Sequence, residues 1–175
     1  MSDSRQALDR IATDLRAPAA QEFLAFLVGE THYALPLAGV RGVVLLPAVT
    51  EVPRSPEHVL GVIKVRGQVT TLIDLRKLLR LPLVVPTPTA RVILVAHGSE
   101  VLGLLVDAVW QVHRLTQDEI EPASVLGGEA PAYLAGIGRP KAPPPFPGGV
   151  RRAAVVGTLA GLLLLLDPDR LLRTK

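Results

Sequence analysis

Short apolar runs, separated every few residues by glycine or proline, constrain this chain more than any other feature. Residues 61–66 (GVIKVR) and 68–73 (QVTTLI) are two such runs, joined through Gly67. Runs of this length that are rich in β-branched residues predict strands, and a glycine between them predicts a tight connection. We therefore expect Arg66 at the turn of a hairpin, with its side chain exposed to solvent.

The same pattern recurs along most of the chain. Residues 22–28, 31–37 and 40–46 predict three strands in succession, and short links of this kind favour antiparallel pairing. Residues 91–97 and 133–138 predict further strands, and 101–115 predict either two strands or one strand that bends near Asp107. Between these sets lies a proline-rich linker at 82–90. The sequence thus predicts a mainly all-β chain of two small barrels, because closure removes exposed sheet edges.

A few segments predict helices or loops instead. Residues 4–17 carry an apolar stripe at helical spacing (Leu8, Ile11, Ala12, Leu15), so residues 1–17 are expected to form an amphipathic extension to a domain spanning 18–175. Asp74 and Asp167 are placed to cap short helices that follow them. The proline-rich stretch 47–61 predicts a loop with a helical turn near 56–60, and 139–149 predicts an exposed loop.

The longest apolar stretch could be mistaken for a membrane span. Residues 153–166 are continuously apolar, but 14 residues fall short of the roughly 20 that a spanning helix needs. We expect two buried strands with a turn at 157–161, and a short core helix is the alternative because leucine favours helices. No direct insertion into a membrane is expected.

Composition excludes several classes of protein. The net charge is only +3, with 19 basic and 16 acidic residues spread along the chain, which does not predict nucleic-acid binding. There is no cysteine, hence no disulfide framework, and the first ten residues are too polar for a secretory signal. A cytoplasmic location is expected.

A search for catalytic chemistry finds no candidate. The four histidines share no metal-binding spacing, so neither a metal nor a cofactor is predicted. Asp74 and Asp107 could form an acid/base pair, but a helix cap and a chain bend are the commoner uses of aspartate in such contexts. Ser55 lacks a nucleophile elbow, and Trp110 is expected to fill space in a barrel. The sequence does not predict an enzyme.

Four segments together resemble a known family. In chain order they are EFLAFLVGETHYALPLAGV, GVIKVRGQVTTLIDLRKLL, RVILVAHGSEVLGLLVDAVWQV and LLLLLDPDRLL, and they span roughly residues 22–173. In this order they are similar to the CheW-like adaptor domain of bacterial chemotaxis. The resemblance implies two small five-stranded SH3-like β-barrels packed together. It also implies a non-catalytic scaffold that couples the cytoplasmic tips of chemoreceptors to the regulatory domain of a CheA-type histidine kinase, recruited to membrane-associated receptor arrays.

The resemblance also places a partner-binding surface. Arg66 and Gly67 match the family's arginine–glycine turn, and arginine suits an interface because its planar guanidinium carries five donors. The expected partner-binding residues are Val40, Arg41, Gly42, Val43, Lys64, Arg66, Gly67 and Gln68. The alternative is that the Arg66 side chain bonds loop carbonyls and only fixes the turn.

Departures from the family pattern suggest distinct partners. This chain has Gly42 where the family commonly has an acidic residue, Lys64 for asparagine and Thr71 for proline. A more positive surface predicts a specialised receptor and kinase set, for example in surface motility. A small-ligand or lipid-binding β-barrel is the rival interpretation. The N-terminal stripe is expected to pack on the barrels or to dock into a partner.

Overall fold

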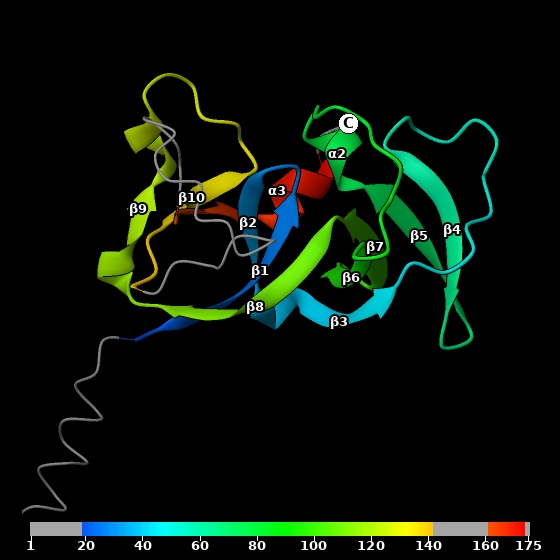
Figure 1. Cartoon of the computed structure of the whole chain (residues 1–175), viewed down its shortest axis with the longest axis horizontal. Helices are drawn as coiled ribbons and strands as arrows, with labels where there is room; N and C mark the ends of the chain where they lie inside the picture. Colours follow the sequence, from blue (N-terminus) through cyan, green and yellow to red (C-terminus); the bar gives the residue numbers. More distant parts are fainter. Residues whose placement is uncertain (1–18, 142–160, 174–175) are drawn as a thin grey trace, which may run out of the picture.

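The computed structural model describes residues 19–141 and 161–173, and these form two β-sheets side by side in an elongated molecule (Figure 1). The first sheet contains β1 (Gln21–Val28), β2 (Thr31–Pro36), β8 (Ala108–Leu115), β9 (Ile120–Pro122), β10 (Leu134–Gly138) and β11 (Leu163–Leu166). The second contains β3 (Val40–Leu45), β4 (Val59–Val65), β5 (Gln68–Asp74), β6 (Arg91–His97) and β7 (Glu100–Val106). Short helical segments are η1 (Leu37–Gly39), α2 (Leu75–Leu78), η2 (Gln117–Glu119), η3 (Ala123–Leu126) and α3 (Pro168–Arg173).

The fold class predicted from the sequence is confirmed, with one difference in strand number. The strand order is β8-β1-β2-β11-β10-β9 in the first sheet and β3-β6-β7-β5-β4 in the second, so the described part of the first sheet has six strands rather than five. In the second sheet, Thr50 and Val62 exchange two backbone hydrogen bonds of 2.9 and 2.8 Å. This bridge joins the chain after β3 to β4 and closes the sheet into a small barrel.

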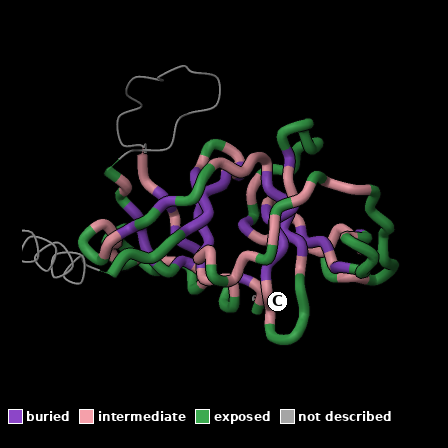
Figure 2. Tube along the Cα trace, turned by 90° about the horizontal axis from the view of Figure 1, so that it is seen from below, coloured by how far each residue is buried: buried purple, intermediate pink, exposed green. Residues whose placement is uncertain are grey.

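The core has three layers, which explains why the strands are apolar at consecutive positions. Side chains of β6 alternate between two clusters: Val92 and Leu94 fill the interior of the second barrel, while Ile93 and Val95 face the first sheet. Leu163 and Leu165 of β11 likewise fill the first barrel, whereas Leu166 lies between the barrels. A strand buried on both faces needs no polar alternation. Figure 2 shows these buried stretches running through the middle of the molecule.

The division of the chain between the two sheets differs from the expectation. The three-residue helix η1 follows β2 and carries the chain into the other sheet, so β3 pairs with β6 and not with β2. The proline-rich linker 82–90 connects β5 to β6, two strands of the same sheet, and so does not separate the barrels. Instead, the chain crosses back at Asp107, where β7 of the second sheet ends and β8 of the first begins. Of the two alternatives predicted for residues 101–115, two strands or one bent strand, the structure therefore has two strands.

The predicted caps are confirmed. The carboxylate of Asp74 accepts a 2.9 Å hydrogen bond from the Arg76 backbone N–H at the start of α2. Asp167 accepts bonds from the N–H groups of residues 169 and 170 at the start of α3. The leucines 163–166 form a strand, so the core helix considered for them is wrong.

Other local predictions are met only in part or fall outside the described residues. The helical turn expected near 56–60 is present only as a single turn closed by the Val59 N–H to Pro56 C=O bond, because β4 already begins at Val59. The predicted helix 4–17, the residues 142–149 of the predicted loop and the first strand predicted within 153–166 lie outside the described residues. No helix in the described ranges is long and apolar enough to cross a membrane.

Candidate partner-binding surface

A two-residue turn forms the end of the β4–β5 hairpin. Val65 pairs with Gln68, which leaves Arg66 and Gly67 as the connection. Both have positive φ, 50° for Arg66 and 81° for Gly67. Turns with positive φ at both central residues match the right-handed twist of hairpin strands. The tight connection predicted at Gly67 is confirmed, and the Arg66 side chain is exposed as expected.

The hairpin tip, which we define as residues 64–69, is cationic and partly apolar. Lys64 and Arg66 are both exposed, and neither forms an ion pair or side-chain hydrogen bond with any described residue. The Arg66 side chain therefore forms no hydrogen bond with a loop carbonyl of the described residues, which was the alternative role considered for it. Val69 lies opposite Lys64 in the register, and 74% of it is exposed. The tip thus offers two free cations beside an aliphatic side chain.

The β3 edge, residues 40–43, presents only half of its predicted residues to solvent. The register of β3 on β6 slips between Val40 and Gly42, so Arg41 is the extra residue of a β-bulge. Arg41 and Val43 are exposed, and Arg41 Nη1 donates a 3.1 Å bond to the Ala38 carbonyl. Val40 packs against the cluster between the barrels. A Cβ on Gly42 would point toward Leu94 Cδ1 at 3.8 Å, hence toward the barrel interior.

Both groups of predicted residues belong to the second barrel. β3 and β4 are the first and the last strand in the order of this sheet, and the Thr50–Val62 bridge connects the two edges. In Figure 1, β3 runs along the lower side of this barrel and the hairpin tip projects beyond it on the same side. The structure therefore brings the eight residues to one barrel, as two separate patches joined by no side-chain hydrogen bond.

A polar joint at Asp107, which the sequence did not reveal as such, holds the two barrels together. Its carboxylate accepts a 3.1 Å bond from Arg76 Nε and pairs closely with Arg76 Nη2. It also accepts a 2.7 Å bond from the Gly29 N–H, in the turn between β1 and β2. One carboxylate thereby connects α2 of the second barrel to the first barrel. Its partners lie 31 and 78 residues away in the sequence, so no local pattern indicated them.

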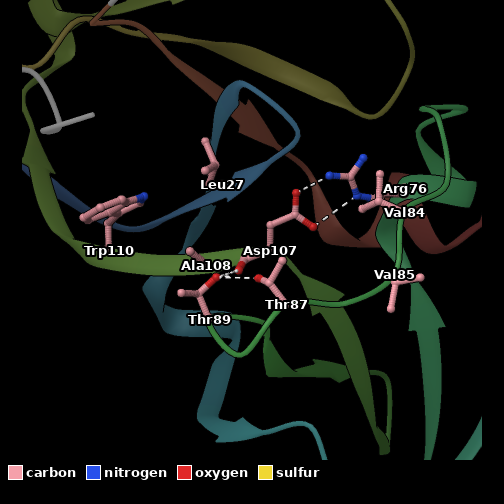
Figure 3. A pocket seen from close by; sticks show the side chains of 9 residues that line it. All are labelled: Leu27, Arg76, Val84, Val85, Thr87, Thr89, Asp107, Ala108 and Trp110. Carbon is pink, nitrogen blue, oxygen red and sulfur yellow. Dashed lines mark hydrogen bonds and ion pairs between the residues drawn. The ribbon is translucent and has the colours of Figure 1, made fainter. Parts of the chain in front are cut away.

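The same joint forms one wall of an apolar pocket of about 270 Å³, which we call the Trp110 pocket (Figure 3). The residues that line it are Leu27, Arg76, Val84, Val85, Thr87, Thr89, Asp107, Ala108 and Trp110. The proline segment 82–89 crosses beside it and is fastened at both ends: Arg76 Nη1 donates to the Pro82 carbonyl at 2.8 Å, and Thr89 Oγ1 donates to the Asp107 carbonyl at 2.9 Å.

The titratable groups show no catalytic arrangement among the described residues. Asp74 caps α2 and Asp107 is engaged by Arg76 and Gly29, so the two aspartates considered as an acid/base pair have structural contacts. Burial lowers the pKa of His113, and the pKa of His32 is lowered by burial and then by the nearby His113. Within the described ranges, no group of three or more His, Asp or Glu residues could hold a metal ion.

Comparisons with known proteins agree with this architecture. A family model described as the CheW-like domain matches residues 22–175. The chemotaxis protein CheW of Helicobacter pylori is 30% identical over 118 residues, covering 67% of this chain and 72% of that protein. The probable chemotaxis protein CheW of Rhizobium etli is 37% identical over 117 residues, 66% of this chain and 74% of that protein.

Two further similarities concern other relatives. The protein FrzA of Myxococcus xanthus is 30% identical over 122 residues, covering 70% of this chain and 76% of that protein. The crystal structure of the scaffolding protein TtCheW from Thermoanaerobacter tengcongensis superposes with a TM-score of 0.70 at 23% identity, over 90% of this chain and 95% of that one. At this identity, the structural match supports the fold.

Proposed function

Because the chain belongs to the CheW-like domain family, we propose that it is a non-catalytic adaptor that couples chemoreceptors to a CheA-type histidine kinase in chemosensory signalling. The match over residues 22–175 carries this proposal, since it includes both barrels and the joint between them. The non-catalytic part of this proposal rests on the family match. We place the protein in the cytoplasm, at membrane-associated receptor arrays, and assign it no nucleic-acid partner.

The hairpin tip and the β3 edge are the surfaces that we assign to the partners, the regulatory domain of the kinase and the cytoplasmic tip of the receptor. Arg66 supports this assignment because its guanidinium has all five donors free of described partners. Desolvating such a group is favourable only when a partner supplies acceptors. Val69 adds apolar surface next to the two cations of the tip.

Lys64 supports the finer proposal of a specialised receptor and kinase set. Its charge is exposed and unpaired, so it adds to the charge of Arg66 at the same tip. Like charges that meet in an interface cost several kcal/mol, so a partner of this tip should carry acidic groups. Position 42 contributes less to this argument, because the Cβ direction of Gly42 is inward. A pull-down that recovers only the general chemotaxis kinase of the cell, or no kinase, would contradict a specialised set.

Calorimetry with the regulatory domain of a CheA-type kinase from the same genome tests the adaptor proposal. We expect Arg66→Ala to lose about 2 kcal/mol or more of binding free energy, as for an interface anchor, with an unchanged melting temperature. Arg54→Ala is the matched control, because Arg54 is also exposed and also has a positive φ, of 61°, in the turn before β4. It should bind as the wild type does.

Three outcomes separate the components of the proposal. Loss of binding in Arg66→Ala alone supports the hairpin tip as a kinase site. Equal binding by the wild type, Arg66→Ala and Arg54→Ala would mean that Arg66 does not contact the kinase, and we would then assign it to the receptor contact. If the wild type binds no CheA-type regulatory domain from its genome, the adaptor proposal is wrong in its choice of partner.

The rival function, a small-ligand or lipid-binding barrel, gains no support from the barrel interiors. Phe23, Leu115 and Leu165 belong to the cluster that fills the first barrel, and Ile63 and Leu72 to the cluster that fills the second. These side chains occupy the space that such a ligand would need. Native mass spectrometry that detected a retained small molecule would reopen this alternative.

A further inference from the structure

The Trp110 pocket has an incompletely covered apolar surface that lies outside the hairpin tip and the β3 edge. Val84 and Val85 are 54% and 85% exposed, next to an equally exposed Leu83 at 61%. Three consecutive aliphatic residues held in water by flanking prolines are unusual on a surface that contacts nothing. The pocket lies beneath them and is lined mostly by apolar atoms.

The polar groups of the pocket indicate the charge and polarity of a group that could occupy it. Trp110 Nε1 is buried and has no hydrogen-bond partner among the described residues, and Figure 3 shows this nitrogen turned toward Leu27. A buried indole N–H without an acceptor is costly, which indicates that the described residues do not complete the surroundings of Trp110. The charges of Arg76 and Asp107 neutralise each other, and Arg76 is also bonded to the Pro82 carbonyl. The pocket therefore suits an apolar group without net charge.

We propose that the N-terminal segment of this chain, residues 1–18, folds back and inserts its apolar stripe into the Trp110 pocket. The stripe consists of Leu8, Ile11 and Leu15, on a segment that the sequence predicts to be helical over 4–17. Its charges balance, with aspartates at 3, 9 and 14 against arginines at 5, 10 and 16. An amphipathic segment of zero net side-chain charge matches a neutral apolar pocket.

The length of the segment allows this docking. Gln21 pairs with Leu115 where the described chain enters β1, and Trp110 lies five residues back along β8, about 17 Å at ~3.3 Å per residue. Counted from Gln21, four extended residues and a helix rising ~1.5 Å per residue place Leu15 up to about 17 Å away and Leu8 up to about 27 Å away. The distance from Gln21 to Trp110 lies at the lower end of this range, so the stripe can reach the pocket.

The single tryptophan of the chain makes the proposal directly measurable. Acrylamide quenching of Trp110 fluorescence compares the full chain with the chain lacking residues 1–17. We expect deletion to raise the quenching constant by about twofold or more and to shift the emission to longer wavelength, since both follow from uncovering a half-buried indole. Adding the synthetic peptide 1–18 to the truncated protein should reverse both changes in a saturable manner.

Point variants test the same contact in the full chain. Ile11→Glu should raise quenching as the deletion does, whereas Arg10→Glu, on the opposite side of the predicted helix, should leave it unchanged. Val85→Glu acts from the pocket side and cannot disturb the core, because 85% of Val85 is already exposed. It should also raise the quenching of Trp110.

Two results would overturn the proposal. One is a quenching constant that is the same with and without residues 1–17. The other is protection of Trp110 that grows with protein concentration in the full chain, because the occupant would then be a second copy and not the segment of the same molecule. Neither result bears on binding of the kinase, so this inference and the adaptor function fail or stand independently.

Discussion

Closure of the second barrel depends on Gly61, and this yields the sharpest stability prediction. Gly61 has a φ of 148°, a conformation that is essentially restricted to glycine. A Cβ at this position would lie 2.2 Å from the Thr50 carbonyl oxygen and 2.8 Å from the Thr50 carbonyl carbon. These are backbone atoms, so no side-chain rotation relieves the clash. Thr50 must move away, and its two hydrogen bonds with Val62 are then lost.

The cost of Gly61→Ala follows from these contacts. The backbone conformation costs about 1–3 kcal/mol for a residue other than glycine. The two hydrogen bonds of the bridge contribute about 1 kcal/mol each. We therefore expect a loss of roughly 3–5 kcal/mol of unfolding free energy, which corresponds to a decrease in melting temperature of roughly 6–20 °C for a chain of this size.

Gly98→Ala is the matched control for this prediction. Gly98 also has a positive φ, of 61°, in the turn between β6 and β7, but a Cβ there meets nothing within 4 Å. It should lose only about 1–2 kcal/mol, the cost of a left-handed backbone. Urea denaturation of the two variants measures the difference. Equal losses would refute the argument that the close approach of Thr50 to Gly61 closes the barrel.

Two further predictions concern buried polar groups. Asp107→Asn should cost about 2 kcal/mol in urea denaturation, because it leaves the largely buried Arg76 without its counter-charge, and adding Arg76→Leu should recover part of this loss. The lowered pKa values of His32 and His113 predict that stability is full above their usual pKa of 6.5 and falls as the pH decreases below it, since the unfolded chain takes up protons first. We expect the melting temperature to depend less on pH between 7.5 and 5 in the double variant His32→Gln/His113→Gln, but not in His58→Gln. An unchanged pH dependence of the melting temperature in the double variant would contradict the assignment.

Local structure was predictable from this sequence wherever a short-range cause produces it. Gly67 between two β-type runs indicated the hairpin turn, and Asp74 and Asp167 indicated helix starts through their ability to accept backbone N–H groups. The continuously apolar runs indicated strands buried on both faces. Each of these features depends on a few neighbouring residues, so the sequence carries the information directly.

The arrangement of the strands was not predictable in the same way. β5 pairs in parallel with β7, and β2 pairs in parallel with β11 across more than 120 residues. Runs that are apolar on both faces give no register signal, because a slip by one residue exposes no polar side chain. The Asp107 joint depends on the same long-range order. For that reason the sequence identified Asp107 as a bend but not as the contact between barrels.

The turn at Arg66 shows why the candidate surface is more than a consequence of the fold. A turn with two positive φ values is best served by asparagine followed by glycine, because asparagine adopts the left-handed region at little cost. This chain has arginine at the first position, with a φ of 50° and no hydrogen bond from its side chain to the described residues that would offset the strain. The fold therefore gains nothing from the guanidinium. This arrangement, at the end of a projecting hairpin beside Lys64 and Val69, supports our proposal that Arg66 binds a partner that supplies the acceptors.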